Sequence, residues 1–374
     1  MALLIETSLA SGRDILSGIA RHIREHHQWS VFHQPRGLQE GIPSGLRGWK
    51  GDGIIARIQD QATLEAVREL NVPVVDVLGV LPESGIACVR ADDAAVARMA
   101  AEHLAERGFR HFAFVGISGE NWSERRREAL RIWTTQRQLT FAVHEAPRGH
   151  GWTEQVELLA KWVANLPRPC GIVVCSDQRG PEVLEACRRA GVGVPDEIAV
   201  VGVDNDVPIC EVSWPPLSSV DPAHEQVGYE AACLMARLLA GEPAPDRETV
   251  LPPRTVAARY SSEVLAISDR VVGSALRLIR ERACEGIGVE DVVDAVPVSR
   301  SVLQRRFRSA LGTSVHDEIL AARLKRAKQL LVETELSYTE VAERAGFRHQ
   351  EYLGAVFKTH TGKTPGRYRT ELRR

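Results

Sequence analysis

Short apolar runs alternate with amphipathic stretches through the first 260 residues of this chain. The runs have the length and β-branched content of buried strands, as in ALLIE (2–6), HFAFVG (111–116), GIVVCS (171–176) and IAVVGVDN (198–205). The stretches between them, such as ILSGIARHIREHH and EVLEACRRAGV, repeat apolar residues at helical spacing. Strand followed by helix, repeated along a chain, predicts parallel sheets that are covered by helices on both faces.

The distribution of these runs predicts two sheets rather than one. About five runs precede Arg90 and three lie between Arg110 and Asn205, and each series has its own helices. A helix near 222–240 and a strand near 248–258 are placed to cross back between the two sheets. We therefore expect an α/β body with two lobes.

Polar and aromatic side chains follow several of the predicted strands directly. In open α/β sheets, ligands bind outside the carboxyl ends of the strands, so these residues are the candidates for a binding site. They are Glu6, Ser8, Arg57, Trp122, Asp177 and Asp204. Carboxylates accept and arginines donate hydrogen bonds to vicinal hydroxyls, and an indole face packs on the C–H surface of a sugar. The set predicts a small polyhydroxy ligand in a cleft between the lobes.

Other site chemistries are disfavoured by the motifs that this chain lacks. No G-x-G-x-x-G or P-loop follows the first predicted strand, where ASGRDIL supplies a single glycine. His22 and His26 fall on the surface of a predicted helix, where histidines are more often solvated than bound to metal. Ser118 in GISGE matches a nucleophile elbow only in part, because the following NWSERRREA is not a tight apolar helix. The sequence therefore predicts a binding protein without catalytic residues, metal or cofactor, and not an enzyme.

Several of these segments together resemble the effector domains of LacI-type regulators over about residues 1–260. The carrying segments are SERRREAL (123–130), GIVVCSDQ, IAVVGVDND and the stretch from LSSVDPAHEQ to ARYSS. The resemblance implies that Arg126, Asp177 and Asp204 contact a sugar. LacI-type regulators carry a DNA-binding domain before this body, whereas this chain begins directly on the first strand. We therefore expect any DNA-binding element to lie elsewhere in the chain.

The last 106 residues contain an internal repeat with an offset of 50 residues. Aligning Phe307 with Phe357 also aligns Gly312 with Gly362, and each copy reads as a short acidic helix, a turn and a longer amphipathic helix. Residues 269–374 hold 20 of the 47 Lys and Arg residues but only 14 of the 49 Asp and Glu residues. A basic tail behind an acidic body is expected where only the tail meets a polyanion.

The longer helix of each copy is a candidate for reading DNA, because a helix in the major groove presents its first turns to base edges. Arginine recognises guanine and glutamine recognises adenine, whereas Arg308 is better placed for phosphate. Arg306 borders the packed face, and its role stays open. The basic residues of the linking helix, including Arg323, are expected to be solvated. The candidate DNA contacts are Ser299, Arg300, Ser301, Gln304, Arg305 and Arg308 in the first copy, and Arg348, His349, Gln350 and Tyr352 in the second.

The two copies resemble the AraC-type DNA-binding domain over about residues 269–374. The resemblance is carried by SRSVLQRRFRSALGTS in the first copy and by GF (346–347), YLGAVFK and TGKTPGRYR in the second. Gly354 and Ala355 stand where that family usually has a small polar residue followed by arginine. The first copy is therefore expected to dominate specificity. We predict an effector domain over 1–260, a linker over 261–268 and a helical DNA-binding domain over 269–374.

A LacI-like effector body followed by an AraC-type reader resembles the bacterial xylose operon activators, with local matches at GWKGDGIIA and RHFAFVGISGENWSERRREA. The resemblance implies D-xylose as inducer, operator DNA and RNA polymerase as partners, a homodimer and activation of transcription. Arg57 stands where we expect an acidic residue in those activators. Another monosaccharide therefore remains an alternative.

Two other classes of protein are weighed against this interpretation. A sugar-converting enzyme would need a catalytic pair or metal set in the cleft, and a constitutive DNA-binding protein would not need polar residues at the strand ends. The seven cysteines are scattered without a CxxC pair, which is typical of a reducing compartment. No apolar run approaches the ~20 residues of a membrane span. We therefore expect a cytoplasmic protein without a membrane partner.

Overall fold

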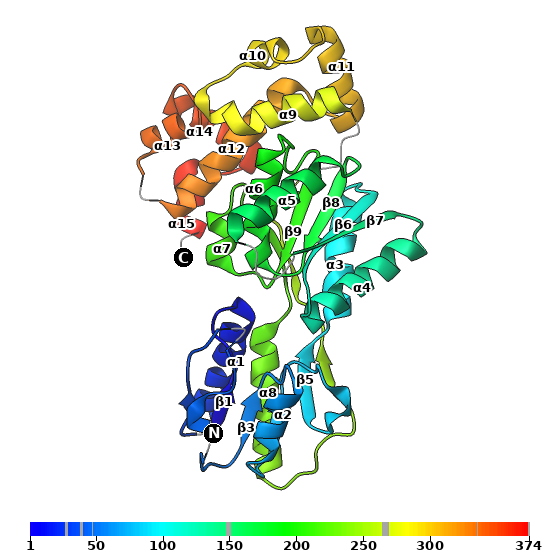
Figure 1. Ribbon diagram of the computed structural model, residues 1–374. Coiled ribbons are helices and arrows are strands. Elements are labelled where there is room, and N and C mark those ends of the chain that lie inside the picture. Colours follow the sequence, from blue (N-terminus) through cyan, green and yellow to red (C-terminus); the bar gives the residue numbers. More distant parts are fainter. Residues whose placement is uncertain are drawn as a thin grey trace. The chain divides into compact units, whose positions relative to one another are not determined.

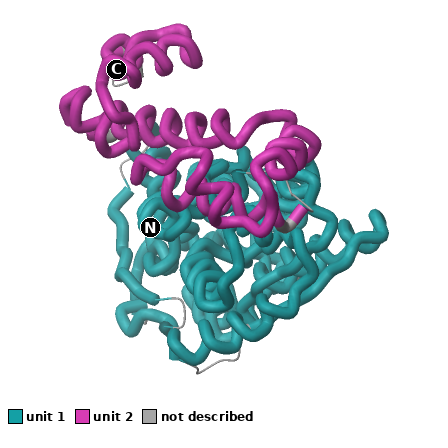
Figure 2. Tube along the Cα trace, turned by 90° about the horizontal axis from the view of Figure 1, so that it is seen from above, with its two compact units in different colours: residues 1–265 teal, residues 266–374 magenta. Residues whose placement is uncertain are grey.

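The computed structural model describes residues 1–26, 29–37, 40–46, 48–146, 151–263, 269–334 and 336–372. The chain forms two compact units, residues 1–265 and 266–374 (Figure 2). The predicted linker spans this division, and its residues 264–268 lie outside the described residues. Within the described ranges, no helix is both long and apolar enough to cross a membrane.

The first lobe of the first unit is a six-stranded sheet in the order β11-β5-β4-β3-β1-β2, and each neighbouring pair is parallel (Figure 1). Its strands are β1 (Ala2–Leu4), β2 (Phe32–His33), β3 (Ile54–Ala56), β4 (Val74–Asp76), β5 (Ala87–Ala91) and β11 (Thr249–Leu251). Its helices are α1 (Ala10–His26), α2 (Gln61–Arg68) and α8 (His224–Leu239).

Alternate residues of β1 and the turn after it pack on opposite faces of this sheet, as the period of a strand requires. Leu3 and Ile5 belong to the cluster that contains apolar residues of α1 and α8. Ala2 and Leu4 belong to the cluster that contains residues of α2. Both faces are therefore buried, which explains why the strands read as continuous apolar runs.

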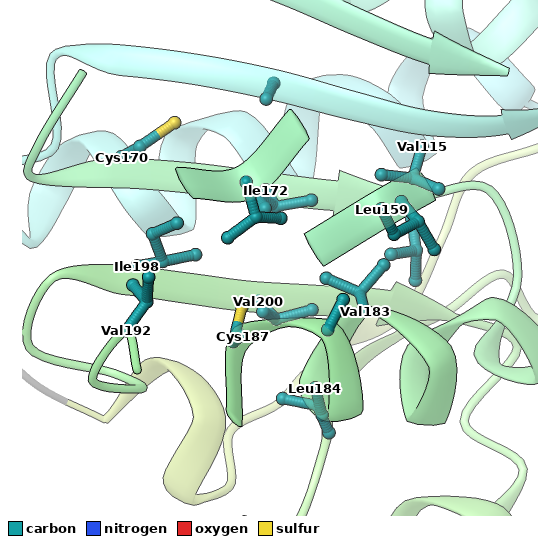
Figure 3. Close-up of a cluster of buried hydrophobic side chains, with 14 of the residues drawn as sticks. Val115, Leu159, Cys170, Ile172, Val183, Leu184, Cys187, Val192, Ile198 and Val200 are labelled. Atoms are coloured by element: carbon teal, nitrogen blue, oxygen red, sulfur yellow. The ribbon is translucent and has the colours of Figure 1, made fainter. Parts of the chain in front are cut away.

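The second lobe is a six-stranded sheet in the order β12-β10-β9-β8-β6-β7, in which only β12 runs antiparallel to its neighbour. Its strands are β6 (His111–Ile117), β7 (Thr140–Ala146), β8 (Cys170–Val174), β9 (Ile198–Val203), β10 (Ser218–Asp221) and β12 (Thr255–Ala257). Its helices are α3 (Asp93–Glu106), α4 (Asn121–Gln136), α5 (Trp152–Ala164), α6 (Gly180–Arg189) and α7 (Val207–Val212). In Figure 3, Ile172 and Val200 of the sheet pack against Leu159 of α5 and Val183 of α6.

These sheets confirm the predicted two-lobed α/β body and correct two of its details. The segment predicted as one strand near 248–258 divides into β11 in the first lobe and β12 in the second. Four strands, not three, lie between Arg110 and Asn205, and β10 was also missed. The sequence SSVD of β10 looks like a loop, but Ser218 Oγ donates to the Arg259 carbonyl at 2.8 Å and Ser219 Oγ to Asp177 Oδ1 at 2.7 Å. These bonds allow polar side chains to be buried in a strand.

The second unit is helical and contains the predicted repeat. Its helices are α9 (Arg270–Arg282), α10 (Val289–Asp294), α11 (Arg300–Leu311), α12 (Val315–Glu333), α13 (Tyr338–Arg344), α14 (Gln350–Thr361) and α15 (Pro365–Leu372). Phe307 and Phe357 are fully buried in two separate apolar clusters, one for each copy. Gly312 and Gly362 end α11 and α14 with φ values of 70° and 71°. This matching geometry confirms that the copies are structural equivalents.

Candidate ligand-binding cleft and DNA-reading helices

A polar cavity in the first unit is lined by residues of both lobes. Four of the candidates from the sequence line it: Arg57 from the end of β3, Trp122 and Arg126 from α4, and Asp204 from the end of β9. The sequence interpretation missed four further polar residues of the lining, namely Ser11, Arg90, Asp93 and His224. The carboxyl ends of strands in both sheets therefore contribute to one cavity.

Arg57 is held at the cavity by a buried carboxylate. Its Nη1 donates to Glu6 Oε1 at 2.5 Å and to Ser11 Oγ at 3.2 Å. Glu6 is 3% exposed and does not line the cavity itself. Burial raises the pKa of Glu6, and the charge of Arg57 opposes this rise. Glu6 thus acts behind Arg57, which it orients.

Arg126 is fixed by three neighbours in the second lobe and is 4% exposed. Its Nε donates to Asp93 Oδ1 at 2.9 Å, and its Nη1 donates to the Cys175 carbonyl at 2.6 Å. Its guanidinium lies 5.1 Å from the centre of the Trp122 ring, within the range of a cation–π contact. The sequence interpretation missed Asp93 because this residue lies in the first turn of α3. An acidic residue is favoured there by the helix dipole alone, so its position did not indicate a role in the cavity.

Asp204 and His224 form a further polar part of the cavity wall. His224 Nε2 lies 3.3 Å from Asp204 Oδ1, and both side chains are almost fully buried. His224 begins α8, which packs against α1 of the first lobe (Figure 1). The sequence offered no sign of this pair, because 20 residues and strand β10 separate its members.

Ser8 and Asp177 do not line the cavity. The side chain of Asp177 is directed into the second lobe, where Ser219 Oγ donates to its Oδ1 and the Asp206 amide donates to its Oδ2, each at 2.7 Å. Asp177 begins a short 3₁₀ helix that follows β8. Burial first and the charge of Asp204 second raise the pKa of Asp177 to about 8.

Hydrogen bonds from the side chains of Arg13, Gln178 and Arg125 also join the two lobes beside the cavity. Arg13 Nη2 of α1 pairs with Asp206 Oδ2 at 2.7 Å, and Gln178 Nε2 donates to the Ser8 carbonyl at 3.2 Å. Arg125 of α4 donates to the carbonyls of Leu78 and Gly79. Ser8 therefore takes part through its backbone rather than through its hydroxyl.

Metal coordination is not indicated in the part of the chain that the structure describes. No group of three or more His, Cys, Asp or Glu side chains there is arranged to hold a metal ion. The cysteines, all within the described ranges, have free thiols.

In the second unit, α11 presents the candidate residues of the first copy. Arg300, Ser301, Arg305 and Arg308 are exposed and Gln304 is partly exposed, whereas Leu303 and Phe307 are buried. Ser299 occupies the N-cap position, but its hydroxyl lies 3.2 Å from Ser301 Oγ and does not cap the helix. Arg300 pairs with Glu290 of α10.

The second copy presents its candidates around the start of α14. Arg348 and His349 precede the helix, Gln350 begins it, and all three are exposed together with Tyr352. Gln350 Oε1 accepts a hydrogen bond from Thr339 Oγ1 of α13 at 2.9 Å. The Tyr352 ring packs edge-on against Phe347, with 6.0 Å between the ring centres.

Two partly exposed arginines of this unit make hydrogen bonds within the protein. Arg306 Nη1 donates to Asp269 Oδ1 at 3.2 Å. Arg323 donates to the carbonyls of Ala283 at 2.9 Å and Ile287 at 2.7 Å, so the expectation that it is solvated was wrong. A helical pattern cannot distinguish a solvated arginine from one that caps a neighbouring helix.

Comparisons with known proteins cover nearly the whole chain. The XylR N-terminal domain matches residues 1–85, a periplasmic binding protein-like domain matches 101–262, and a helix-turn-helix domain matches 292–371. The chain is 32% identical to the xylose operon regulatory protein of Escherichia coli K12, over 99% of this chain and 96% of that protein. The corresponding protein of Haemophilus influenzae is 31% identical, over 99% and 97%.

Solved structures agree with these sequence matches. The structure of the xylose-binding transcription activator XylR has a TM-score of 0.85 and 32% identity, over 99% of this chain and 97% of that chain. A LacI-family regulator of Mycobacterium smegmatis, at 22% identity, has a TM-score of 0.58 over 71% of this chain, which shows the shared fold of the effector body. With an α/β effector body and a helix-turn-helix domain in the same order and over nearly the same length, the chain belongs to the family of xylose operon regulatory proteins, which are transcription regulators.

Proposed function

We propose that this protein activates genes of xylose catabolism by binding D-xylose in the cleft of its first unit and operator DNA through α11 and α14. The observation that carries the proposal is a charge-paired polar cleft, built by both lobes, in a chain that also holds two exposed helices of the recognition type. The full-length relatives are named as regulators of the xylose operon, which supports D-xylose as the first candidate ligand.

The charges of the cleft favour an uncharged polyhydroxy ligand. Arg57 is paired with Glu6, Arg126 with Asp93, and Arg90 with Glu248 through two hydrogen bonds of 2.9 and 2.5 Å. Each guanidinium therefore has a carboxylate partner, and a bound carboxylate or phosphate would compete with one. Hydroxyl groups can donate to Asp204 and accept from the arginines without breaking these pairs.

A second monosaccharide remains a candidate because of Arg57. This residue presents a donor where an acceptor is expected in xylose operon activators, so the hydroxyl pattern that it recognises differs at that point. We infer that Glu6, Arg57, Trp122, Arg126 and Asp204 determine which sugar binds, with Glu6 acting through Arg57.

The coupling between sugar and DNA is a population shift. Sugar stabilises the state in which the lobes meet around the cavity. The DNA-binding domains of two chains then bind adjacent half-sites, and from there the protein contacts RNA polymerase. In each of the two chains, Arg300, Gln304 and Arg305 of α11 contact base edges and Arg308 contacts a phosphate. The residues around the start of α14 contribute less to base recognition. This activity belongs in the cytoplasm, where the operator is accessible.

Two measurements on the full-length protein test the proposal. Calorimetric titration with D-xylose, other pentoses, hexoses and D-xylonate should give a Kd for one neutral sugar and no binding of the sugar acid. DNase footprinting of the promoter region should then show protection that strengthens with that sugar. Absence of binding by every neutral sugar would reject the ligand assignment, and a footprint that no sugar changes would reject the coupling.

A further inference from the structure

One carboxylate joins the entrance of the second unit to the first recognition helix. Asp269 occupies the N-cap of α9, where its Oδ1 accepts from the backbone amides of Val271 at 2.9 Å and Val272 at 3.4 Å. The same carboxylate accepts from Arg306 Nη1, at 3.2 Å on Oδ1 and 3.4 Å on Oδ2. Arg306 lies on α11, 37 residues further along the chain.

The apolar contact between α9 and α11 fixes which face of α11 is buried, but it is not directional. Leu276 and Ile279 of α9 share a cluster with Leu303 and Phe307 of α11, and such packing has little directional preference. An ion pair at one edge of this contact is directional. Arg306 follows Arg305 directly, so fixing its guanidinium on Asp269 also fixes the direction in which Arg305 leaves the helix, about 100° away.

Asp269 also directly precedes α9, which is the first helix of the second unit. A displacement or rotation of the preceding chain therefore acts on the N-terminus of α9 before it acts on any other helix. Both members of the pair are partly exposed, with side chains 41% and 28% accessible, so the pair is of the kind that can open and close.

We propose that Arg306 is a positioning residue and that the Asp269–Arg306 pair transmits the state of the effector unit to the reading face of α11. Arg306 does not contact DNA in this scheme; it sets the rotation from which Arg300 and Arg305 reach base edges. The regulatory part of this inference rests on the proposed sugar response, whereas the positioning part does not.

Substitutions at both ends of the pair separate this role from helix capping. Asp269→Ser keeps a good N-cap but has no oxygen that reaches Arg306, and Arg306→Gln removes the charge from the other end. Both should reduce the ratio of operator affinities with and without D-xylose towards one, while sugar affinity stays unchanged. Arg306→Lys should retain most of the ratio. Arg308→Gln is the matched control: loss of a phosphate contact should lower both affinities equally and leave the ratio as it was.

Hydrogen exchange of the protein without sugar or DNA tests positioning separately. Amides of α11 should exchange several-fold faster in Asp269→Ser than in the wild type, and those of α14 should not change. Unchanged exchange in α11 overturns the positioning role. If the wild-type protein has the same operator affinity with and without D-xylose, both the proposed sugar response and the transmitting role are rejected. The hydrogen-exchange result still tests the positioning role in that case. A normal wild-type ratio that both variants retain overturns transmission alone.

Discussion

Asp204 lines the cavity from a backbone φ of 108°, a positive value that is uncommon for any residue with a side chain. Its carboxylate combines two tasks, since it faces the cleft and lies beside His224. The side chain of Asp177 does not line the cavity, and its carboxylate accepts hydrogen bonds from residues of its own lobe. Two aspartates that look equivalent in the sequence therefore have different chemistry.

Asp204→Asn is expected to weaken D-xylose binding by roughly 10- to 100-fold, because a hydrogen bond to a charged group contributes about 1.5–3 kcal/mol. Asparagine accepts the same backbone conformation, so the fold should be retained. Calorimetric titration measures the effect. Asp221→Asn is the control, since Asp221 pairs with Arg254 and does not line the cavity. Equal affinities of the Asp204 variant and the wild type would remove Asp204 from the site.

Asp177 should make the stability of the protein dependent on pH. Its pKa is about 8 in the folded protein against an ordinary value of 3.8, because burial and then Asp204 disfavour the charged form. Between these two values the unfolded chain has lost the proton and the folded protein has kept it. The free energy of unfolding therefore falls as pH rises through this window, by at most about 1.4 kcal/mol per pH unit for this group.

The neutral variant Asp177→Asn is expected to flatten that dependence. Its stability relative to the wild type should rise steadily from about pH 4 to about pH 8, since asparagine does not titrate. Urea denaturation at a series of pH values provides the measurement. Parallel stability curves for the two proteins would show that Asp177 is ionised in the fold.

At the scale of elements, α11 and α14 share the same backbone features and buried residues but differ in their exposed side chains. Both begin after a tight turn, bury one phenylalanine and end on a left-handed glycine. However, α11 exposes three arginines, at 300, 305 and 308, whereas α14 has Gly354 in its interior. The shared backbone features follow from the repeat. The difference in exposed side chains is the basis for the prediction that the first copy dominates specificity.

Two glycines of the second copy are expected to respond to alanine in opposite directions. A Cβ at Gly354 meets no atom within 4 Å, so Gly354→Ala should stabilise the protein by about 1 kcal/mol. Gly346 has a φ of 79°, and a Cβ there would lie 2.6 Å from the Ala283 carbonyl oxygen. Gly346→Ala should therefore destabilise the protein by about 1–3 kcal/mol. Urea denaturation of both variants checks the signs, and destabilisation by Gly354→Ala would show that this helix position is not free.

At the scale of the whole molecule, the effector body depends on contacts between segments that are far apart in sequence. The lobes are linked beside the cavity by the pair of Arg13 with Asp206, two residues separated by 193 positions. Such contacts exist only while the lobes meet, so they add to the stability of the ligand-binding state. A ligand that binds only this state has an apparent affinity proportional to the fraction of the protein that is in that state.

Arg13→Gln is expected to weaken sugar binding by about two- to fivefold, the range for a partly exposed ion pair of ~0.5–1 kcal/mol. Arg13 does not line the cavity, so the loss would reflect lobe closure and not a lost ligand contact. The control is Arg21→Gln, which removes a pair with Glu225 inside the first lobe. Titration calorimetry of both variants decides: an equal loss in the two would point to general destabilisation.

The sequence by itself determined the two-lobed body, the helical unit with its repeat, and four of the residues that line the cavity. These features are local, because strand and helix periods, caps and motif residues are expressed within a few positions of the chain. The capping box of Ser337 with Glu340 and the N-cap by Asp269 are local in the same sense, because each joins residues at most three positions apart.

Only the tertiary structure decided which side chains meet. It paired Arg126 with Asp93 across 33 residues and Arg57 with Glu6 across 51, directed Asp177 away from the cleft, and joined Arg306 to Asp269. The physical reason is that the direction of a side chain at a strand or helix end depends on the elements that pack beside it. Those elements come from distant parts of the chain, and no local pattern records their positions.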